Sequence, residues 1–268
     1  GTDAASPRGL SRQAPLATIG QALTNIAADS LDYSLVVCLS THTETLTGTL
    51  TINKSITLVG EGTSGGKPTV KLYNNQAGNG LGIDVTATSV NIYNIYFGAQ
   101  SQANTSAKIK FSSGGIDSRL SGCYFEQTAT DTGAAVEQNH TSGMIVDGCT
   151  FISTATSAAS RPAQGYSMTT TGTVTLRDCI FDGGTVGFSG RAFDINGNAV
   201  TSVRADNCTL KNGAIAVMDN TACVGYWNGS FTGGGHVEWD GALVQHPGGL
   251  GETSGDPICT AEQIVISG

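Results

Sequence analysis

Four acidic residues are the candidates for acid–base chemistry in this sequence: Glu126, Asp147, Asp178 and Asp182. They fall near one place in successive copies of a repeat, and stacked copies bring equivalent positions to about 4.8 Å from each other. Glycoside hydrolysis needs two carboxyl groups about 5–10 Å apart. Glu126 and Asp182 belong to copies that are not adjacent, and the copy between them supplies no acid at that position.

The other two acids have a non-acidic counterpart in the next copy. Asp147 aligns with Arg177, and Asp178 aligns with Asn207. We expect a surface ion pair from the first alignment, because the charges are opposite. We expect a row of bend residues from the second, because Asp and Asn tolerate left-handed backbone. The sequence therefore predicts no catalytic residue.

Metal and cofactor binding are not predicted either. The seven cysteines contain no CxxC pair and no Cys/His metal spacing. The glycines of residues 60–68 match neither phosphate-binding pattern. The four histidines are far apart, and we expect them in solvated loops or the C-terminal tail; they are His42, His140, His236 and His246.

Aromatic residues and glycosylation sequences give two further candidates. Tyr226, Trp227 and Trp239 are of the type that stacks on sugars, but packing in the core or tail is the favoured interpretation. Five Asn-x-Ser/Thr sequences are attributed to chance in a chain rich in these residues; they begin at Asn53, Asn104, Asn139, Asn207 and Asn228.

The elements that position these residues follow from an internal repeat. Five clear copies occupy residues 90–97, 118–125, 145–151, 174–181 and 203–210, with a weaker copy at 224–231. The central column of the alignment is Ile95, Cys123, Cys149, Cys179 and Cys208, at separations of 28, 26, 30 and 29 residues. The column two places later is Phe97, Phe125, Phe151, Phe181 and Leu210.

A third apolar column predicts a bend within each copy. It stands three places before the central column and consists of Ile92, Leu120, Val146, Leu176 and Ala205. A three-residue step breaks the alternation of a strand. The residues just before the central column accept left-handed backbone, as this bend requires; they are Asn94, Gly122, Gly148, Asp178 and Asn207.

Stacking such copies predicts an all-β, right-handed parallel β-helix, with unbridged cysteines and phenylalanines in inward rows. A β-sandwich does not predict one bend at one offset in five copies. Propeller repeats are longer, and the leucine-rich consensus is absent. Residues 15–28 show helical spacing, with Pro15 expected in the first helical turn, and predict a short N-terminal capping helix.

Two regions are expected along the chain. Residues 1–231 form the N-terminal cap and the β-helix, and residues 232–268 form a C-terminal cap or assembly tail with a short strand at 263–266. Before the repeats, strands are expected near 35–39, 44–52 and 55–59. Residues 60–68 form a surface excursion.

Composition limits the partners. The net charge is −8 and there is no run of Lys or Arg, so no nucleic-acid partner is expected. No apolar stretch is long enough to span a bilayer, so no membrane partner is expected.

Residues 17–23 and 45–62 (TIGQAL and TLTGTLTINKSITLVGEG) resemble the first rungs of pectin methylesterases and related carbohydrate-active β-helix proteins. The resemblance implies the architecture. The catalytic segments of that family are not found, and the polygalacturonase set is missing too, so no functional residue is carried over.

The Cys-x-Phe rows, the polar spacers and the segment 1–23 resemble β-helix structural proteins of tailed bacteriophages, such as head decoration proteins and spikes. This resemblance implies a non-enzymatic virion protein that binds capsid or appendage proteins as a homotrimer. It would be assembled in the host cytoplasm and exposed on the virion surface. The alternatives are a polysaccharide-degrading or polysaccharide-binding β-helix protein and an extracellular adhesin or filament subunit. Surface glycans are a further candidate partner.

Overall fold

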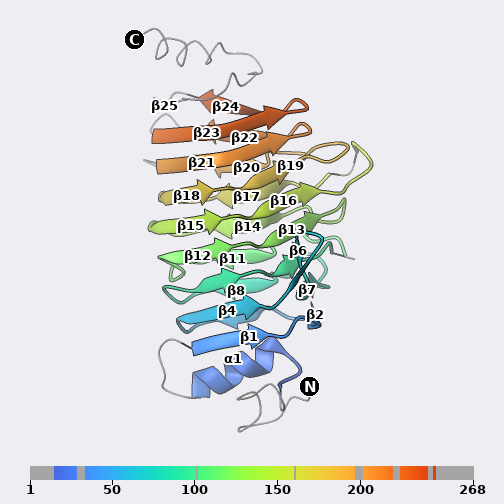
Figure 1. Ribbon diagram of the computed structural model, residues 1–268, viewed down its shortest axis with the longest axis vertical. Coiled ribbons are helices and arrows are strands. Elements are labelled where there is room, and N and C mark those ends of the chain that lie inside the picture. The colour runs from blue at the N-terminus through green and yellow to red at the C-terminus, as the bar shows by residue number, and fades with distance from the viewer. Residues whose placement is uncertain are drawn as a thin grey trace.

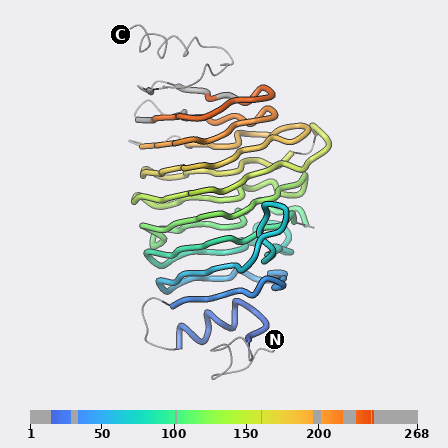
Figure 2. The backbone as a smooth tube through the Cα atoms, in the orientation of Figure 1, coloured from blue at the N-terminus to red at the C-terminus, as the bar shows by residue number. Residues whose placement is uncertain are grey.

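The chain folds into a parallel β-helix with one helix at its N-terminal end, as predicted (Figure 1). The computed structural model describes residues 15–28, 34–100, 102–159, 161–196, 202–219, 224–240 and 244–245. The backbone coils from the N-terminal end to the C-terminal end in stacked turns (Figure 2).

Three faces run along the solenoid. The first consists of β1 (Ser34–Cys38), β4 (Ile56–Gly60), β9 (Asn91–Tyr93), β12 (Ser118–Ser121), β15 (Gly143–Asp147) and β18 (Thr173–Arg177). The second consists of β2 (Thr43–Leu46), β7 (Lys71–Asn74), β10 (Tyr96–Phe97), β13 (Tyr124–Gln127), β16 (Thr150–Ser153) and β19 (Ile180–Asp182). The long strands β21 (Ser202–Lys211) and β23 (Val224–Thr232) join these two faces in one 15-stranded sheet, which β25 (Val244–Gln245) extends.

The third face is a separate 8-stranded sheet. Its strands are β3 (Leu50–Ile52), β8 (Ile83–Val85), β11 (Ile109–Phe111), β14 (Ala134–Gln138), β17 (Gln164–Met168), β20 (Phe193–Asn196), β22 (Ile215–Asp219) and β24 (His236–Asp240). Each strand pairs in parallel with the equivalent strand of the next rung.

The predicted bend lies between the first and second faces. All five bend residues have positive φ; they are Asn94 (54°), Gly122 (61°), Gly148 (59°), Asp178 (50°) and Asn207 (53°). The strand register also follows the predicted alignment, since Phe125 pairs with Phe97 and Phe151. The repeat in the sequence is therefore the rung of the solenoid.

The interior is built from the predicted rows. Phe97, Phe125, Phe151 and Phe181 stack with ring centroids 4.8–4.9 Å apart and nearly parallel planes. The four cysteines of the central column are buried free thiols, as predicted; they are Cys123, Cys149, Cys179 and Cys208. Burial raises the pKa of Cys149 and Cys179 well above the ordinary thiol value, so both stay protonated at neutral pH.

The helix α1 (Ile19–Ala28) covers the N-terminal end of the stack (Figure 1). It starts four residues after Pro15, so the prediction that Pro15 lies in the first helical turn is wrong. Thr18 is the N-cap, because its Oγ1 accepts a hydrogen bond from the Gln21 amide at 3.1 Å. The Glu44 carboxylate accepts one from the Ile19 amide at 2.8 Å.

Three segments differ in detail from the predictions. The strand expected at 44–52 is divided into β2 and β3 by a corner. The excursion at 60–68 contains an antiparallel hairpin, β5 (Thr63–Ser64) and β6 (Lys67–Pro68). Parallel pairing continues beyond Phe231 in β24 and β25. Residues 1–14 and the strand predicted at 263–266 lie outside the described residues.

Candidate functional site

Asp147 and Arg177 lie side by side on the outer surface of the first face. Asp147 lies on β15 and Arg177 on β18, and the two residues are directly paired in the register of these strands. However, the ion pair of Asp147 is formed with Arg119 of the preceding rung, so the prediction of an Asp147–Arg177 pair is wrong in its partner. Asp147 thus has Arg177 as its register partner in β18, whereas Arg119 lies in β12 two residues before Ser121, the register partner of Asp147 in that strand, and reaches it through its side chain.

Asp178 and Asn207 form the predicted ladder at the bend. The Asn207 side-chain amide donates a hydrogen bond of 2.6 Å to the Asp178 carboxylate, and both residues have left-handed backbone. This contact links two rungs and stabilises the bend.

Glu126 and Asp182 lie on the outer surface of the second face, with Ile152 between them in the register. Glu126 accepts a hydrogen bond from the Tyr96 hydroxyl. Asp182 accepts hydrogen bonds from Asn212 (2.8 Å) and the Gly184 amide (2.9 Å), and its other oxygen lies 3.1 Å from the Lys211 ammonium.

The environment of Asp182 keeps its carboxylate ionised. Burial alone would raise the pKa of this group, but the hydrogen bonds from Asn212, Gly184 and Lys211 outweigh burial and lower it. A general acid needs a raised pKa. Asp182 is therefore poorly suited to proton donation.

Two aromatic or imidazole candidates lie in the interior. Trp227 is fully buried in the core, which agrees with the packing interpretation; the side chain of Trp239 lies outside the described residues. His140 is only 3% exposed, so the prediction of a solvated loop histidine is wrong for it. His42 contacts Glu44 at 3.1 Å. The side chain of His236 and all of His246 lie outside the described residues.

Two tyrosines form the most distinctive arrangement on the outer surface. Tyr96 and Tyr124 occupy paired positions of β10 and β13, and their rings stack at 5.2 Å with an interplanar angle of 5°. The Lys71 ammonium lies 5.7 Å from the Tyr96 ring centroid, and the Lys67 ammonium lies 4.4 Å from that of Tyr124. With Glu126, these four side chains make up what we call the tyrosine patch.

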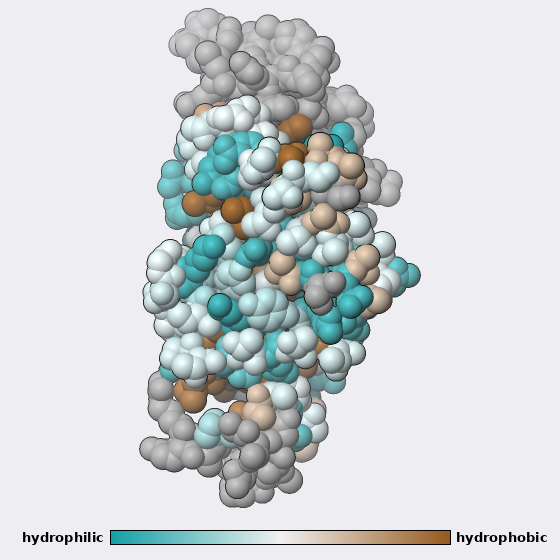
Figure 3. Space-filling view, turned by 90° about the vertical axis from the view of Figure 1, so that its right-hand side faces the viewer, coloured by the Kyte–Doolittle hydropathy of each residue, from teal (hydrophilic) through white to brown (hydrophobic). Residues whose placement is uncertain are grey.

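The patch belongs to a largely polar surface. Figure 3 looks onto the right-hand side of Figure 1, where the strands of the second face lie, and pale and teal residues dominate it with scattered brown ones.

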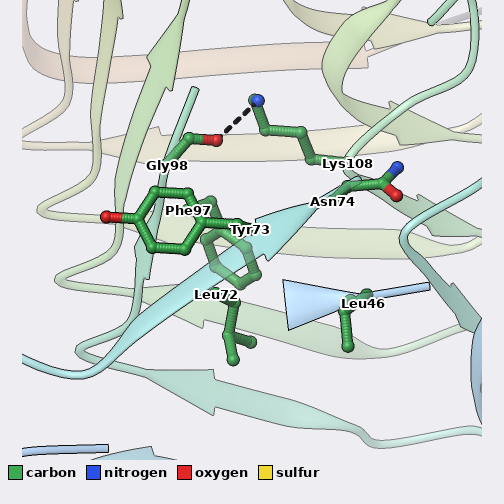
Figure 4. A pocket seen from close by; sticks show the side chains of 7 residues that line it. All are labelled: Leu46, Leu72, Tyr73, Asn74, Phe97, Gly98 and Lys108. Carbon is green, nitrogen blue, oxygen red and sulfur yellow. Dashed lines mark hydrogen bonds between the residues drawn. The ribbon is translucent and has the colours of Figure 1, made fainter. Parts of the chain in front are cut away.

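A small pocket lies under the corner that follows the second face (Figure 4). Its volume of about 10 Å³ is room for about one water molecule. Lys108 borders it, and its ammonium donates hydrogen bonds to the Gly98 carbonyl at 2.9 Å and the Asp131 carboxylate at 2.6 Å. The side chains of Lys108 and Asp131 are only 3% and 2% exposed.

Burial lowers the pKa of Lys108, and the Asp131 carboxylate opposes this effect. Among the described residues, the side-chain oxygens of Gln100 and Gln127 are buried without a hydrogen-bond partner. The pocket therefore belongs to a buried polar corner and is too small for a ligand of more than a few atoms.

Sequence reasoning missed the tyrosine patch and the Lys108–Asp131 pair. The repeat alignment contained a signal for part of the first, because Tyr96 and Tyr124 both follow the central column. It contained none for Lys67, Lys108 or Asp131, which lie in connections of unequal length.

Within the described ranges, no group of three or more His, Cys, Asp or Glu side chains is placed to hold a metal ion. In the same ranges, no helix has the length and apolar character needed to cross a membrane.

Comparison with protein-family models, with curated proteins and with solved structures found no match to this chain. The function is therefore argued from the chain's own surface and fold.

Proposed function

We propose that this chain is a non-enzymatic structural protein of a tailed-bacteriophage particle, a capsid decoration or spike component that presents its β-helix on the virion surface. The phage assignment rests on the sequence resemblance. The observation that carries the structural role is that three ion pairs on the outside of the solenoid each join consecutive rungs.

Three outer ion pairs form these links. Lys110 pairs with Glu137 at 2.8 Å across β11 and β14, Asp182 pairs with Lys211 across β19 and β21, and Arg119 pairs with Asp147. Each pair joins consecutive rungs. Individually such partly exposed surface pairs contribute about 0–1 kcal/mol. Together they add polar links between neighbouring rungs on the outside of the solenoid, which suits a stable particle surface.

The proposed partners are capsid or appendage proteins and two further copies of the chain, because closed cyclic symmetry buries equivalent surfaces without leaving an open assembly. Assembly would take place in the host cytoplasm. An extracellular adhesin or filament subunit is the alternative location and role.

Light scattering of the purified full-length chain tests the assembly. We expect about three times the chain mass of 27.3 kDa, and we expect the protein in the particle fraction when virions are sedimented. A strictly monomeric protein that is absent from that fraction would contradict the proposal.

The second candidate function is polysaccharide binding or cleavage, favoured by the tyrosine patch and the carboxylates Glu126 and Asp182 on one outer face. A screen of acidic and neutral polysaccharides tests it, with Glu126→Gln and Asp182→Asn as variants. Turnover by the native protein that both variants lose would establish the enzyme and overturn the structural proposal. Turnover that both variants retain, or no turnover, speaks against this carboxylate pair as a catalytic site.

A further inference from the structure

The hairpin β5–β6 positions Lys67 over the Tyr124 ring, a contact that strand pairing in the solenoid would not produce. Lys71 pairs directly with Tyr96 on adjacent rungs, so its position beside that ring follows from strand stacking. Lys67 has no such relation to Tyr124, which lies on β13, two rungs beyond β7. The chain leaves the stack after Gly60 and returns at Thr69; we call residues 61–68 the strap.

The strap is fixed at its base and exposed at its tip. At the base, the Asn94 side-chain amide donates to the carbonyls of Gly60 (2.7 Å) and Gly62 (3.1 Å). The Thr69 hydroxyl donates to the Glu61 carbonyl at 2.9 Å. At the tip, Gly65 and Gly66 have positive φ, and a Cβ on either would meet nothing within 4 Å. The tip is thus open to solvent while Lys67 reaches back to the sheet.

The surface beneath Lys67 has the chemistry of a cation site. The Lys67 ammonium lies 4.4 Å from the Tyr124 ring centroid, within the range of a cation–π contact. Tyr124 is only 8% exposed, and its ring stacks against the ring of Tyr96. The Glu126 carboxylate adds negative charge, and the Tyr96 hydroxyl orients it. The pKa of Lys67 is raised, chiefly by a hydrogen bond with Tyr124, against a smaller lowering by burial.

We propose that Tyr124 and Glu126 form a binding site for the primary ammonium of a lysine side chain on an extended segment of a partner protein, and that Lys67 occupies this site as a built-in substitute. A lysine on an extended peptide is favoured because the present occupant is a lysine on a short β-strand. Lys67 is itself exposed, and an exposed cation–π contact contributes only about 0.5–1 kcal/mol. A partner can therefore displace it.

Nα-acetyl-lysine N-methylamide is the probe, and its binding to the full chain is followed through the ring resonances of Tyr124. An intramolecular occupant competes at an effective concentration of about millimolar. We therefore expect Lys67→Ala to bind the probe about two- to fivefold more tightly than the native chain, which is the fold-change that about 0.5–1 kcal/mol corresponds to. Lys71→Ala, which removes the other cation of the patch but leaves Lys67 in place, should behave like the native chain.

One further variant and one control ligand keep the test independent of folding defects. Lys67→Ala/Glu126→Gln retains both rings and should lose most of the gained affinity. Nα-acetyl-norleucine N-methylamide, which lacks the charge, should not bind Lys67→Ala. The proposal is overturned if Lys67→Ala shows no saturable shift, if the norleucine probe binds equally, or if the added Glu126→Gln change has no effect. Saturable binding of glucosamine without binding of the lysine probe would overturn the protein partner in favour of an amino sugar.

Discussion

At the scale of single residues, the inward positions have sharply different roles from the outward ones beside them. Phe151 is fully buried between Phe125 and Phe181, whereas Thr156, a few residues later, is exposed in the connection that leads to the third face. Mutational effects should therefore change abruptly over a few residues.

Phe151→Ala is expected to lower the free energy of unfolding by about 3–5 kcal/mol, because it empties a place in a closely packed row. Chemical denaturation measures this change. Thr156→Ala is the control and should alter stability by less than about 0.5 kcal/mol. Ser153 is not a suitable control, since its buried hydroxyl donates to the Gly187 carbonyl at 3.1 Å. A loss below about 1 kcal/mol for Phe151→Ala would mean that the row tolerates a cavity.

His140 makes stability depend on pH in a defined direction. Burial lowers its pKa from 6.5, while the Ser142 backbone and the Asp117 carboxylate act in the opposite sense. Among the described residues, neither ring nitrogen has a hydrogen-bond partner. The folded protein therefore favours the neutral ring. The contribution of this preference to the free energy of unfolding is fully present above pH 6.5, and it is lost as the pH falls through the lower folded-state pKa.

Unfolding free energy measured between pH 7 and pH 5 should fall in the native protein and fall less in His140→Gln. Asp182, with a pKa lowered from 3.8, acts only at lower pH, so the two groups are separable. Equal slopes for the native protein and the variant in this interval would show that His140 is not responsible.

At the scale of elements, the bend between the first and second faces is the feature that defines a rung. Its five residues have φ values between 50° and 61°, which L-residues other than Gly, Asn and Asp rarely adopt. A steric clash does not explain the glycine at position 122, because a Cβ added to Gly122 would meet no atom within 4 Å.

Gly122→Ala isolates the strain of the bend. We expect it to destabilise the fold by about 1–2 kcal/mol through left-handed backbone alone. Gly48→Ala is the matched control, because its Cβ also meets nothing but its φ lies outside the left-handed region. That change should be neutral or stabilising by up to about 1 kcal/mol. If thermal melts show the same effect for both variants, backbone strain does not explain the glycine at the bend.

The predictability of the elements depended on repetition. The bend and the inward rows could be read from the sequence because each copy repeats the same offsets, as with Cys149 and Phe151. Connections differ in length from rung to rung, so no offset places Lys108 beside Asp131 or Lys67 over Tyr124. His140 was misjudged for the same reason, since the corner that buries it has no equivalent with the same residue in other copies.

At the scale of the whole molecule, the stack has an end that must be protected. Each rung is paired on both sides except at the ends of the sheets, and an unpaired strand edge is a site for association. Ile19 of α1 is 2% exposed and packs into the core at the N-terminal end. The helix therefore closes the apolar interior there.

Ile19→Asp should loosen this cap and promote self-association, which light scattering at several protein concentrations would detect. Ala27→Asp introduces the same charge on an exposed position of α1 and should leave the assembly state unchanged. Absence of association in both variants would indicate that the cap does not prevent association. Association by both would point to charge or helix stability instead.

The parallel register of the rungs has a mechanical consequence. Inter-strand hydrogen bonds are perpendicular or slanted to the strands, and here they run along the long axis of the molecule. A pull on the two ends would load these bonds in series, one rung junction at a time, whereas a push along the same axis would press the rungs together. A molecule that stands on a surface would thus resist compression far better than tension, and it would give way under tension at a single junction before the rest of the stack.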